Sequence, residues 1–200
     1  MNKKVNLIES KRLYIKKLEF EDALHFKDWS LFDNPYLFGY NYGNFSELET
    51  RIWFNSIKTI RKKYYAVYEK KEDKFVGFLG LKNIKVFQKS ARLGIVFDPG
   101  NVEKGYGYEA MMRFLDYFFN DLDFNTMELF VNSFNKRALN LYKKLGFIKI
   151  SEFLEVFENQ FINADDINFF KKNGQVYSKL YKMKLEKERY IESKITKNDA

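Results

Sequence analysis

The stretch EKGYGYEAMM, residues 103–112, contains two glycines one residue apart, directly before an amphipathic run. Only 10 of the 200 residues are glycine. Glycine costs backbone entropy, and it is used where φ must be positive or where another group approaches the main chain closely. The stretch therefore predicts either a tight turn into a helix or a loop that receives a phosphate at the helix N-terminus.

The sequence on either side of this stretch follows two hydrophobic periods. Runs rich in aromatic and β-branched residues predict strands, and apolar residues recurring every three or four positions predict helices. We expect strands at 12–18, 64–70, 74–84, 91–98, 126–132, 147–157 and 175–185, and helices at 19–30, 46–63, 108–122 and 136–146. We expect loops at 33–44 and 163–174, and fraying over 188–200.

The order of these elements predicts the fold class. The strands within 64–98 are separated by short charged or polar turns, which is typical of an antiparallel meander. Two strand–helix crossovers follow, so we expect a mixed, mostly antiparallel sheet with helices on both faces, an α/β fold. Ser46 with Glu49 forms a capping box at one helix start, and Gly146 ends the last helix. We expect a single domain over 1–187 and a C-terminal tail over 188–200.

Composition narrows the class of protein. The net charge of +8 and pI of 9.3 favour an anionic partner, but the lysines are dispersed among acidic residues, which is typical of a solvated surface. A nucleic-acid-binding protein is the alternative that this charge leaves open. The chain has no cysteine and a single histidine, His25, so we expect no metal site. With no long apolar run we expect no membrane partner and a cytoplasmic location.

The glycine pair fits three phosphate-binding schemes unequally. A Walker loop would start at Gly100 and Gly105, but Tyr106 and Gly107 stand where Lys and Ser/Thr are needed. The dinucleotide pattern is met by Gly105, Gly107 and Ala110, yet the first glycine comes too long after the preceding strand. A helix N-terminus whose free amides hold a phosphate needs no side-chain charge, and this third scheme fits best.

Two separate motifs carry a resemblance to a known family. A strand ending IVFDP, followed by VEKGYGYEA, resembles the pyrophosphate loop of the GNAT (GCN5-related) N-acetyltransferases. VNSFNKRALNLYKKLGF, residues 131–147, resembles the second motif of that family through Asn135, Ala138, Tyr142, Gly146 and Phe147. The opening IESKRLYIKKLEFEDA looks like the Rim-like branch, which includes ribosomal-protein N-terminal acetyltransferases.

The resemblance implies a GNAT fold, acetyl-CoA as co-substrate and direct attack of an amine on the thioester. It assigns coenzyme binding to the main chain at the end of one strand, to the glycine loop and to one asparagine: Ile95, Val96, Phe97, Val102, Glu103, Lys104, Gly105, Tyr106, Gly107, Tyr108 and Asn135. Two residues depart from the family pattern. Val102 replaces the Arg or Gln that opens the loop motif, with Lys104 as a possible substitute, and Arg92 stands where a glutamate base is common.

The same resemblance makes Tyr142 the acid that protonates the departing thiolate. The alternative is that Tyr142 is a core aromatic of an amphipathic helix, and Asn135 has the parallel alternative of a helix N-cap. The aromatic residues Tyr36, Phe38, Tyr40 and Tyr42 are expected to shape the acceptor pocket. The general base is open among Glu69, Glu72, Asp73, Glu103 and water.

The acceptor is expected to be a primary amine on a small molecule or peptide, with a protein N-terminus as one form. An amino-sugar or aminoglycoside acetyltransferase on the same fold is an alternative, and a non-catalytic coenzyme A sensor is another, since Val102 and Arg92 depart from the pattern. The chain is expected to be a monomer or a homodimer.

Overall fold

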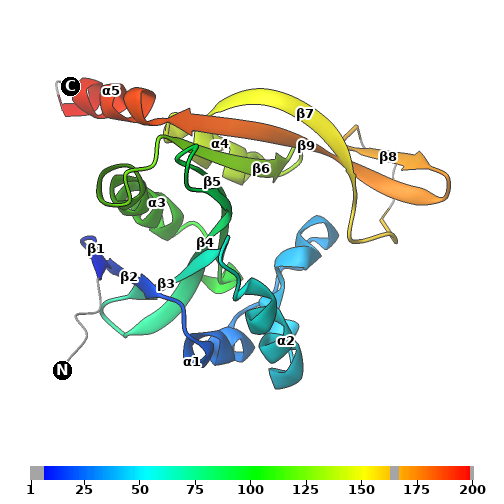
Figure 1. The fold of residues 1–200 in the computed structure, drawn as a ribbon. Coiled ribbons are helices and arrows are strands. Elements are labelled where there is room, and N and C mark those ends of the chain that lie inside the picture. The colour runs from blue at the N-terminus through cyan, green and yellow to red at the C-terminus, as the bar shows by residue number, and fades with distance from the viewer. Residues whose placement is uncertain (1–6, 163–166, 199–200) are drawn as a thin grey trace.

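The protein is described here by a computed structural model of residues 7–162 and 167–198. Within these residues one nine-stranded sheet runs through the molecule (Figure 1). Its strands are β1 (Ile8–Glu9), β2 (Leu13–Lys17), β3 (Lys63–Glu69), β4 (Lys74–Lys85), β5 (Ser90–Phe97), β6 (Thr126–Asn132), β7 (Ile148–Val156), β8 (Phe169–Lys172) and β9 (Gln175–Glu186). The α-helices are α1 (Phe20–Ala23), α2 (Glu47–Ile57), α3 (Tyr106–Asp116), α4 (Lys136–Lys144) and α5 (Lys187–Asn198).

The sheet has the order β1-β2-β3-β4-β5-β6-β9-β7, and β8 also pairs with β9. Strands β3, β4 and β5 form the expected antiparallel meander. Every pair is antiparallel except β5 with β6, which are joined through α3. A parallel pair needs such a crossover, and it makes the sheet mixed, as expected.

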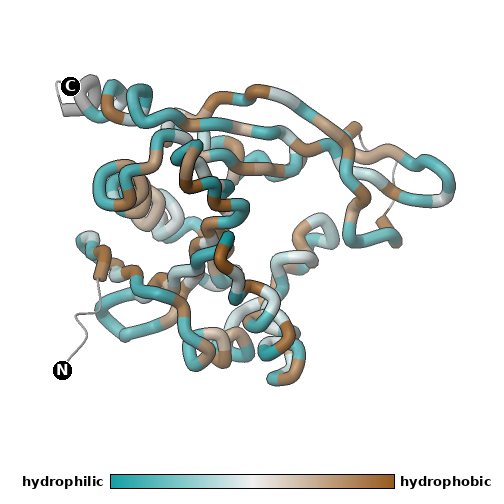
Figure 2. The backbone as a smooth tube through the Cα atoms, viewed as in Figure 1, coloured by the Kyte–Doolittle hydropathy of each residue, from teal (hydrophilic) through white to brown (hydrophobic). Residues whose placement is uncertain are grey.

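Alternation along the strands gives the sheet two apolar faces, each covered by helices. One cluster joins Leu93 and Leu129 to Phe114 of α3 and Leu139 of α4. The other joins Phe78 to Phe26 and to Phe54 of α2. Figure 2 shows hydrophobic residues concentrated along β4 and β5 and hydrophilic ones in the turn between β3 and β4. Helices on both faces and the α/β class are therefore confirmed.

Several helices are shorter than their periodicity predicts. The segment 19–30 contains only one turn of α-helix before a 3₁₀ helix at Leu24–Asp28, and α2 ends at Ile57 because Lys63 already pairs with Leu81 in the sheet. After Asp116, α3 widens into a π-helical turn at Tyr117–Asp121. The expected loop at 33–44 contains two 3₁₀ helices, Pro35–Tyr40 and Tyr42–Asn44.

The capping signals are confirmed at both predicted ends. Ser46 and Glu49 make the reciprocal capping box of α2. Gly146 has φ +97°, and the amides of Gly146 and Phe147 donate to the carbonyls of Lys143 and Tyr142. These two bonds are the Schellman arrangement, which satisfies the last carbonyls of α4.

Two segments expected to lack regular structure have it. The expected loop at 163–174 contains β8, which turns into β9 through Asn173 and Gly174, both at positive φ; residues 163–166 lie outside the described part. The residues expected to fray form α5, apart from 199–200, which lie outside the described part. Tyr190 is only 2% exposed; its ring lies 5.2 Å from that of Phe119 and its hydroxyl donates to Asp116 at 2.9 Å.

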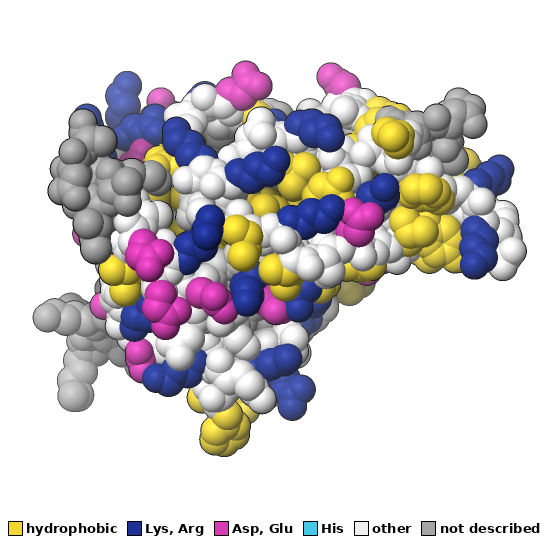
Figure 3. Space-filling view, turned by 90° about the horizontal axis from the view of Figure 1, so that it is seen from above, with side chains coloured by type: hydrophobic (Ala, Val, Ile, Leu, Met, Phe, Trp, Pro, Cys, Tyr) yellow, Lys and Arg dark blue, Asp and Glu magenta, His cyan; other side chains and the backbone are white. Residues whose placement is uncertain are grey.

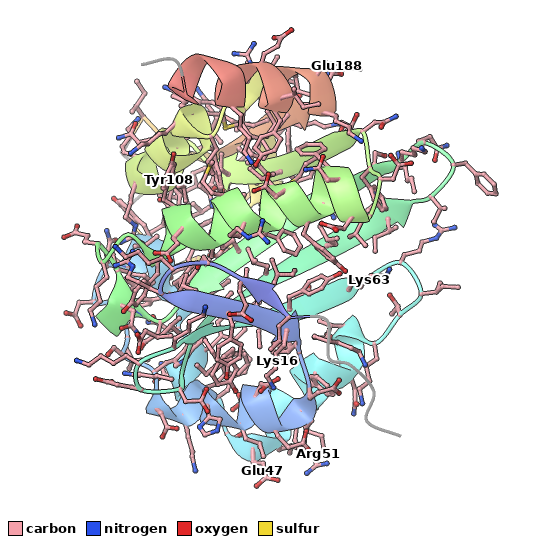
Figure 4. The ribbon with its side chains drawn as sticks, turned by 90° about the vertical axis from the view of Figure 1, so that its left-hand side faces the viewer. Lys16, Glu47, Arg51, Lys63, Tyr108 and Glu188 are labelled. Atoms are coloured by element: carbon pink, nitrogen blue, oxygen red, sulfur yellow. The ribbon has the colours of Figure 1, made fainter. Side chains whose placement is uncertain are left out.

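The outer surface carries mixed charge. Figure 3 shows Lys and Arg side chains interspersed with Asp and Glu on the face seen from above, in line with their distribution along the sequence. In Figure 4, Lys16 of β2 lies near α1, where its ammonium pairs with Asp22 at 2.6 Å. No helix among residues 7–162 and 167–198 is long and apolar enough to cross a membrane.

Replacing Tyr190 with Ala is expected to lower the free energy of unfolding by about 3 kcal/mol, since the change removes a buried ring and leaves a cavity. Urea unfolding followed by circular dichroism measures this. Glu188→Ala, on the exposed side of the same helix (Figure 4), is the control and should change stability by no more than about 0.5 kcal/mol. Equal stability of the two variants would contradict the packing of α5.

Candidate active site

Strands β5 and β6 part in the middle of the sheet. Their parallel pairing joins Ser90–Leu93 to Thr126–Leu129 and goes no further, although β5 continues to Phe97 against β4. The main chain of residues 94–97 therefore has no partner strand on its β6 side. A cavity of about 670 Å³ opens at this parting, and Ile95, Val96 and Phe97 line it.

The N-terminus of α3 lies at the same cavity. Gly105 is the N-cap residue, with φ +79° and no side-chain cap, and it lines the cavity together with Tyr106, Gly107 and Tyr108. The first amides of a helix have no partner within the helix and carry partial positive charge. An open, uncapped helix start of this kind binds phosphate groups.

The two glycines have different physical reasons. Gly105 needs its left-handed backbone, whereas Gly107 has no positive φ. A Cβ on Gly107 would meet Leu141 at 3.6 Å and Phe97 at 3.8 Å, which are ordinary van der Waals distances. The protein itself therefore has room for a side chain at Gly107, and its absence leaves space for something bound against the main chain.

Side chains from distant segments hold the loop before α3. Buried Asp98 accepts from the Asn101 amide at 2.7 Å, and Asn101 in turn accepts from the Lys104 ammonium at 2.8 Å. Arg12 donates to the Lys104 carbonyl at 2.9 Å and pairs with Glu109 at 2.6 Å. These contacts fix the direction of the loop amides. Arg12 carries no sequence signal for this role, because its partners are about ninety residues away.

The structure brings most of the expected loop residues to the cavity, but not all. Val102 and Glu103 line it, and Glu103 has a positive φ of 70°. Lys104 does not line it, and its ammonium is engaged by Asn101. Tyr108 is labelled in Figure 4 at the start of α3; the Lys144 ammonium of α4 lies 4.5 Å from its ring centroid.

Helix α4 supplies the opposite wall through Asn135 and Tyr142. The Asn135 side-chain oxygen accepts from the Ala138 amide at 3.1 Å, so Asn135 is the N-cap, and its side chain still lines the cavity. Tyr142 belongs to the buried core and also lines the cavity, which joins its two alternative interpretations. Burial raises the pKa of Tyr142 above its ordinary value, so the phenol keeps its proton at neutral pH.

The expected acceptor aromatics divide into two pairs. Tyr40 and Tyr42 line the cavity, and burial raises the pKa of both phenols. Tyr36 and Phe38 line a separate hollow with Asn159 instead. The Tyr36 ring packs 4.9 Å from that of Phe169, and Phe38 is 48% exposed. The reason is the 3₁₀ helix Pro35–Tyr40, which turns these two side chains toward the β8 hairpin.

The carboxylates considered as bases also divide. Glu69 caps the amides of the β3–β4 turn, and Asp73 accepts from the Tyr14 hydroxyl; neither lines the cavity. Of the four named, only Glu103 does. Sequence reasoning missed Glu155 of β7, which lines the cavity, and Glu158, whose carboxylate lies against Gly39. Burial, with the charge of Glu155, raises the pKa of Glu158.

Sequence reasoning also missed most of the wall formed by the meander and its neighbours. The missed lining residues include Phe32, Trp53, Tyr64, Phe78, Lys82, Phe130 and Arg137. Their signal was present in part, since Phe78, Gly80 and Lys82 share a strand face by period two. No group of three His, Asp or Glu side chains that could hold a metal occurs among the described residues.

The site thus joins an open helix start for a diphosphate, a main-chain edge that can pair with an amide-bearing arm, and a protonated phenol. This combination defines an acyl-coenzyme A-dependent transferase. The profile of the acetyltransferase (GNAT) domain matches residues 12–148, and the chain belongs to this family of acetyl-CoA-dependent N-acetyltransferases.

Individual proteins agree with this assignment. Spermidine N(1)-acetyltransferase of Vibrio cholerae is 30% identical over 129 residues, which are 64% of this chain and 72% of that protein. The uncharacterized protein YkkB of Bacillus subtilis is 26% identical and covers 73% of this chain, with 87% of its own length matched. A crystal structure of the Vibrio cholerae spermidine enzyme with CoA and spermine superposes with a TM-score of 0.68 at 23% identity, over 91% of this chain and 99% of that one.

Gly107→Ala is expected to weaken acetyl-CoA binding at least tenfold while leaving the apo protein as stable as before, or more stable by up to about 1 kcal/mol. Alanine is the better helix residue and fits the free protein, so only a ligand held against the main chain would meet its methyl group. Calorimetric titration and urea unfolding measure the two effects.

Gly174→Ala, at the β8–β9 turn with open space around it, is the matched control. This change should lower stability, because Gly174 has φ +76°, and should leave acetyl-CoA affinity unchanged. Undiminished affinity of Gly107→Ala would show that the diphosphate lies elsewhere.

Proposed function

We propose that this protein acetylates a primary amine by direct attack on acetyl-CoA within the 670 Å³ cavity, with Tyr142 as the proton donor. The observation that carries the proposal is the convergence on one cavity of the β5–β6 parting, the uncapped start of α3 and a phenol that keeps its proton. Ile95, Val96, Phe97 and Asn135 are the proposed contacts of the pantetheine arm.

The transfer needs no acyl-enzyme, and its atoms balance as follows. The lone pair of the neutral amine attacks the thioester carbonyl carbon, and a new C–N bond forms. The C–S bond then breaks, its electron pair leaves with sulfur, and the phenol of Tyr142 gives this thiolate a proton. The attacking nitrogen loses one proton, so the products are an N-acetyl amide and coenzyme A thiol.

Burial sets a condition on Tyr142. Because burial raises the pKa of the phenol, a phenolate in this site is costly and cannot persist. The proton lost by the amine must therefore return to Tyr142 within the same turnover. Glu155 on the cavity wall, or Glu158 behind Gly39, is the proposed acceptor on that route, and the raised pKa of Glu158 suits a base near neutrality.

The acceptor is the finer part of the proposal. A Rim-like protein N-terminal acetyltransferase is the interpretation that the opening of the sequence favours. A polyamine acetyltransferase is the second candidate, because the Vibrio cholerae relative is a spermidine N(1)-acetyltransferase and Glu155 lines the cavity. Coenzyme A release measured over N-terminal peptides, polyamines and amino sugars tests both. Acetyl-CoA binding without turnover of any amine would contradict the enzymatic proposal.

Tyr142→Phe is expected to lower kcat about 100-fold or more while leaving acetyl-CoA affinity within about threefold, because the ring remains and only the proton is lost. Tyr177→Phe, outside the cavity on β9, is the control with unchanged kcat. An unchanged kcat in the Tyr142 variant would assign this side chain to the core alone.

The pH dependence follows from the same burial. Since the pKa of Tyr142 lies above the ordinary value of about 10, kcat should show no descending limb between pH 7 and about 10. Initial rates of coenzyme A release at saturating substrates measure this. A descending limb in that range, absent from Tyr142→Phe, would contradict the assigned protonation state.

A further inference from the structure

Two cations lie opposite each other inside the cavity. Lys82 of β4 and Arg92 of β5 are register partners, so their side chains share one face of the sheet. The next row on that face is Gly80 opposite Gly94, with the Tyr64 ring over Gly80. Lys82, Arg92, Gly94 and Tyr64 all line the cavity.

Both cations point into the cavity. The Cε and Nζ atoms of Lys82 lie 3.4 Å from where a Cβ of Gly94 would be, so this side chain folds back over the glycine. The Arg92 guanidinium carbon lies 4.6 Å from the ring centroid of Phe130, another lining residue. A lysine at a surface would instead extend its ammonium into water.

Neither cation has an acidic partner among the described residues: no ion pair and no side-chain hydrogen bond joins either to another side chain. Glu128, the register neighbour of Arg92 on β6, pairs with Lys182 at 2.7 Å. Burial, then the charges of Arg92 and Lys62, lower the pKa of Lys82. Like charges directly opposite in a sheet are destabilising, and a partly buried cation without a partner adds to this cost.

We propose that Lys82 and Arg92 form a subsite for an anionic oxygen group of the acceptor, a carboxylate or a phosphate, so that the acceptor is an amine carrying such a group. This inference rests on the proposed N-acetyltransferase function. Lysine offers a compact charge, and a guanidinium stacked on Phe130 keeps its N–H edge free for two oxygens. An acceptor with positive charges only would be repelled here.

The geometry also gives the separation of amine and anion. The Lys82 ammonium lies over Gly94, two residues along β5 from Val96, where the thioester is proposed to lie. Two residues of an extended strand span about 7 Å. A chain of about four to six bonds between the amine and the anionic group fits this distance, whereas the single carbon of an α-amino acid is too short.

The test compares amines of matched length with acetyl-CoA at saturation: n-butylamine, 1,4-diaminobutane, 4-aminobutanoic acid and 3-aminopropyl phosphate, with glycine as the short acid. For the wild-type protein we expect kcat/KM of at least one four-atom anionic amine to exceed that of n-butylamine about tenfold or more, mainly through KM. The acid and the phosphate distinguish the two forms of the anion.

Variants locate the effect. The ratio of kcat/KM between the anionic amine and n-butylamine should fall to near one in Lys82→Gln/Arg92→Gln and be largely retained in Lys82→Arg. Lys85→Gln, exposed on the same strand and outside the cavity, should keep the wild-type ratio. A wild-type ratio near one, or a ratio that survives in the double variant, would overturn the proposal.

The two proposals fail differently. Equal turnover of neutral, dicationic and anionic amines would contradict the anion subsite and leave the acetyltransferase function standing. If acetyl-CoA raises the melting temperature but no amine is acetylated, the proposed function fails. Melting of the coenzyme A-saturated protein with 4-aminobutanoic acid or 3-aminopropyl phosphate then decides the subsite: a rise in the wild type that the double variant lacks supports it, and no difference overturns it.

Discussion

The parting of β5 from β6 after Leu93 is the constraint on which the rest of the site depends. A sheet strand normally satisfies its main chain on both sides, and buried backbone groups without partners are costly. Here β4 satisfies one side of β5 to its end, and the cavity takes the place of a strand on the other. An extended molecule bearing amide groups can complete this edge, which is why the family's coenzyme suits the fold.

The helix start at Gly105 works because distant side chains hold it. The direction of the loop amides is fixed from outside by Arg12 and from beneath by Asp98 through Asn101. None of these side chains has to carry charge to a phosphate, since the amides and the helix dipole supply it. This accounts for a loop that tolerates Val102 in place of the family's Arg or Gln and uses Lys104 as a structural donor to Asn101.

The two sides of the parting have different chemistry. Toward α3 and α4 the cavity offers main-chain amides, Asn135 and Tyr142, which the family shares. Toward the face of α2 it offers aromatic rings over a glycine row, with Lys82 and Arg92 at its edge. The chemistry of transfer thus sits on the side built from local motifs, while acceptor choice sits where β4, β5 and the 3₁₀ segment Pro35–Tyr40 meet.

Local signals determined the parts that a few consecutive residues can fix by themselves. Ser46 with Glu49, Gly146 after α4 and the alternating meander gave correct elements, because caps and strand alternation act within one turn or strand. Asn173-Gly174 marks the β8 hairpin just as locally, and the expected loop there overlooked it. The tail was expected to fray because its mean polarity is high, although Tyr190 alone anchors α5.

The sequence by itself determined the α/β class, the family and the residues that line the coenzyme side, since the motifs there are contiguous. Only the tertiary structure decided that Tyr40 and Tyr42 line the cavity while Tyr36 and Phe38 do not, and that Arg12 holds Lys104. It also decided that Lys82 lies opposite Arg92. The physical reason is that strand register and helix direction are set by packing between segments far apart in the chain, which no local pattern records.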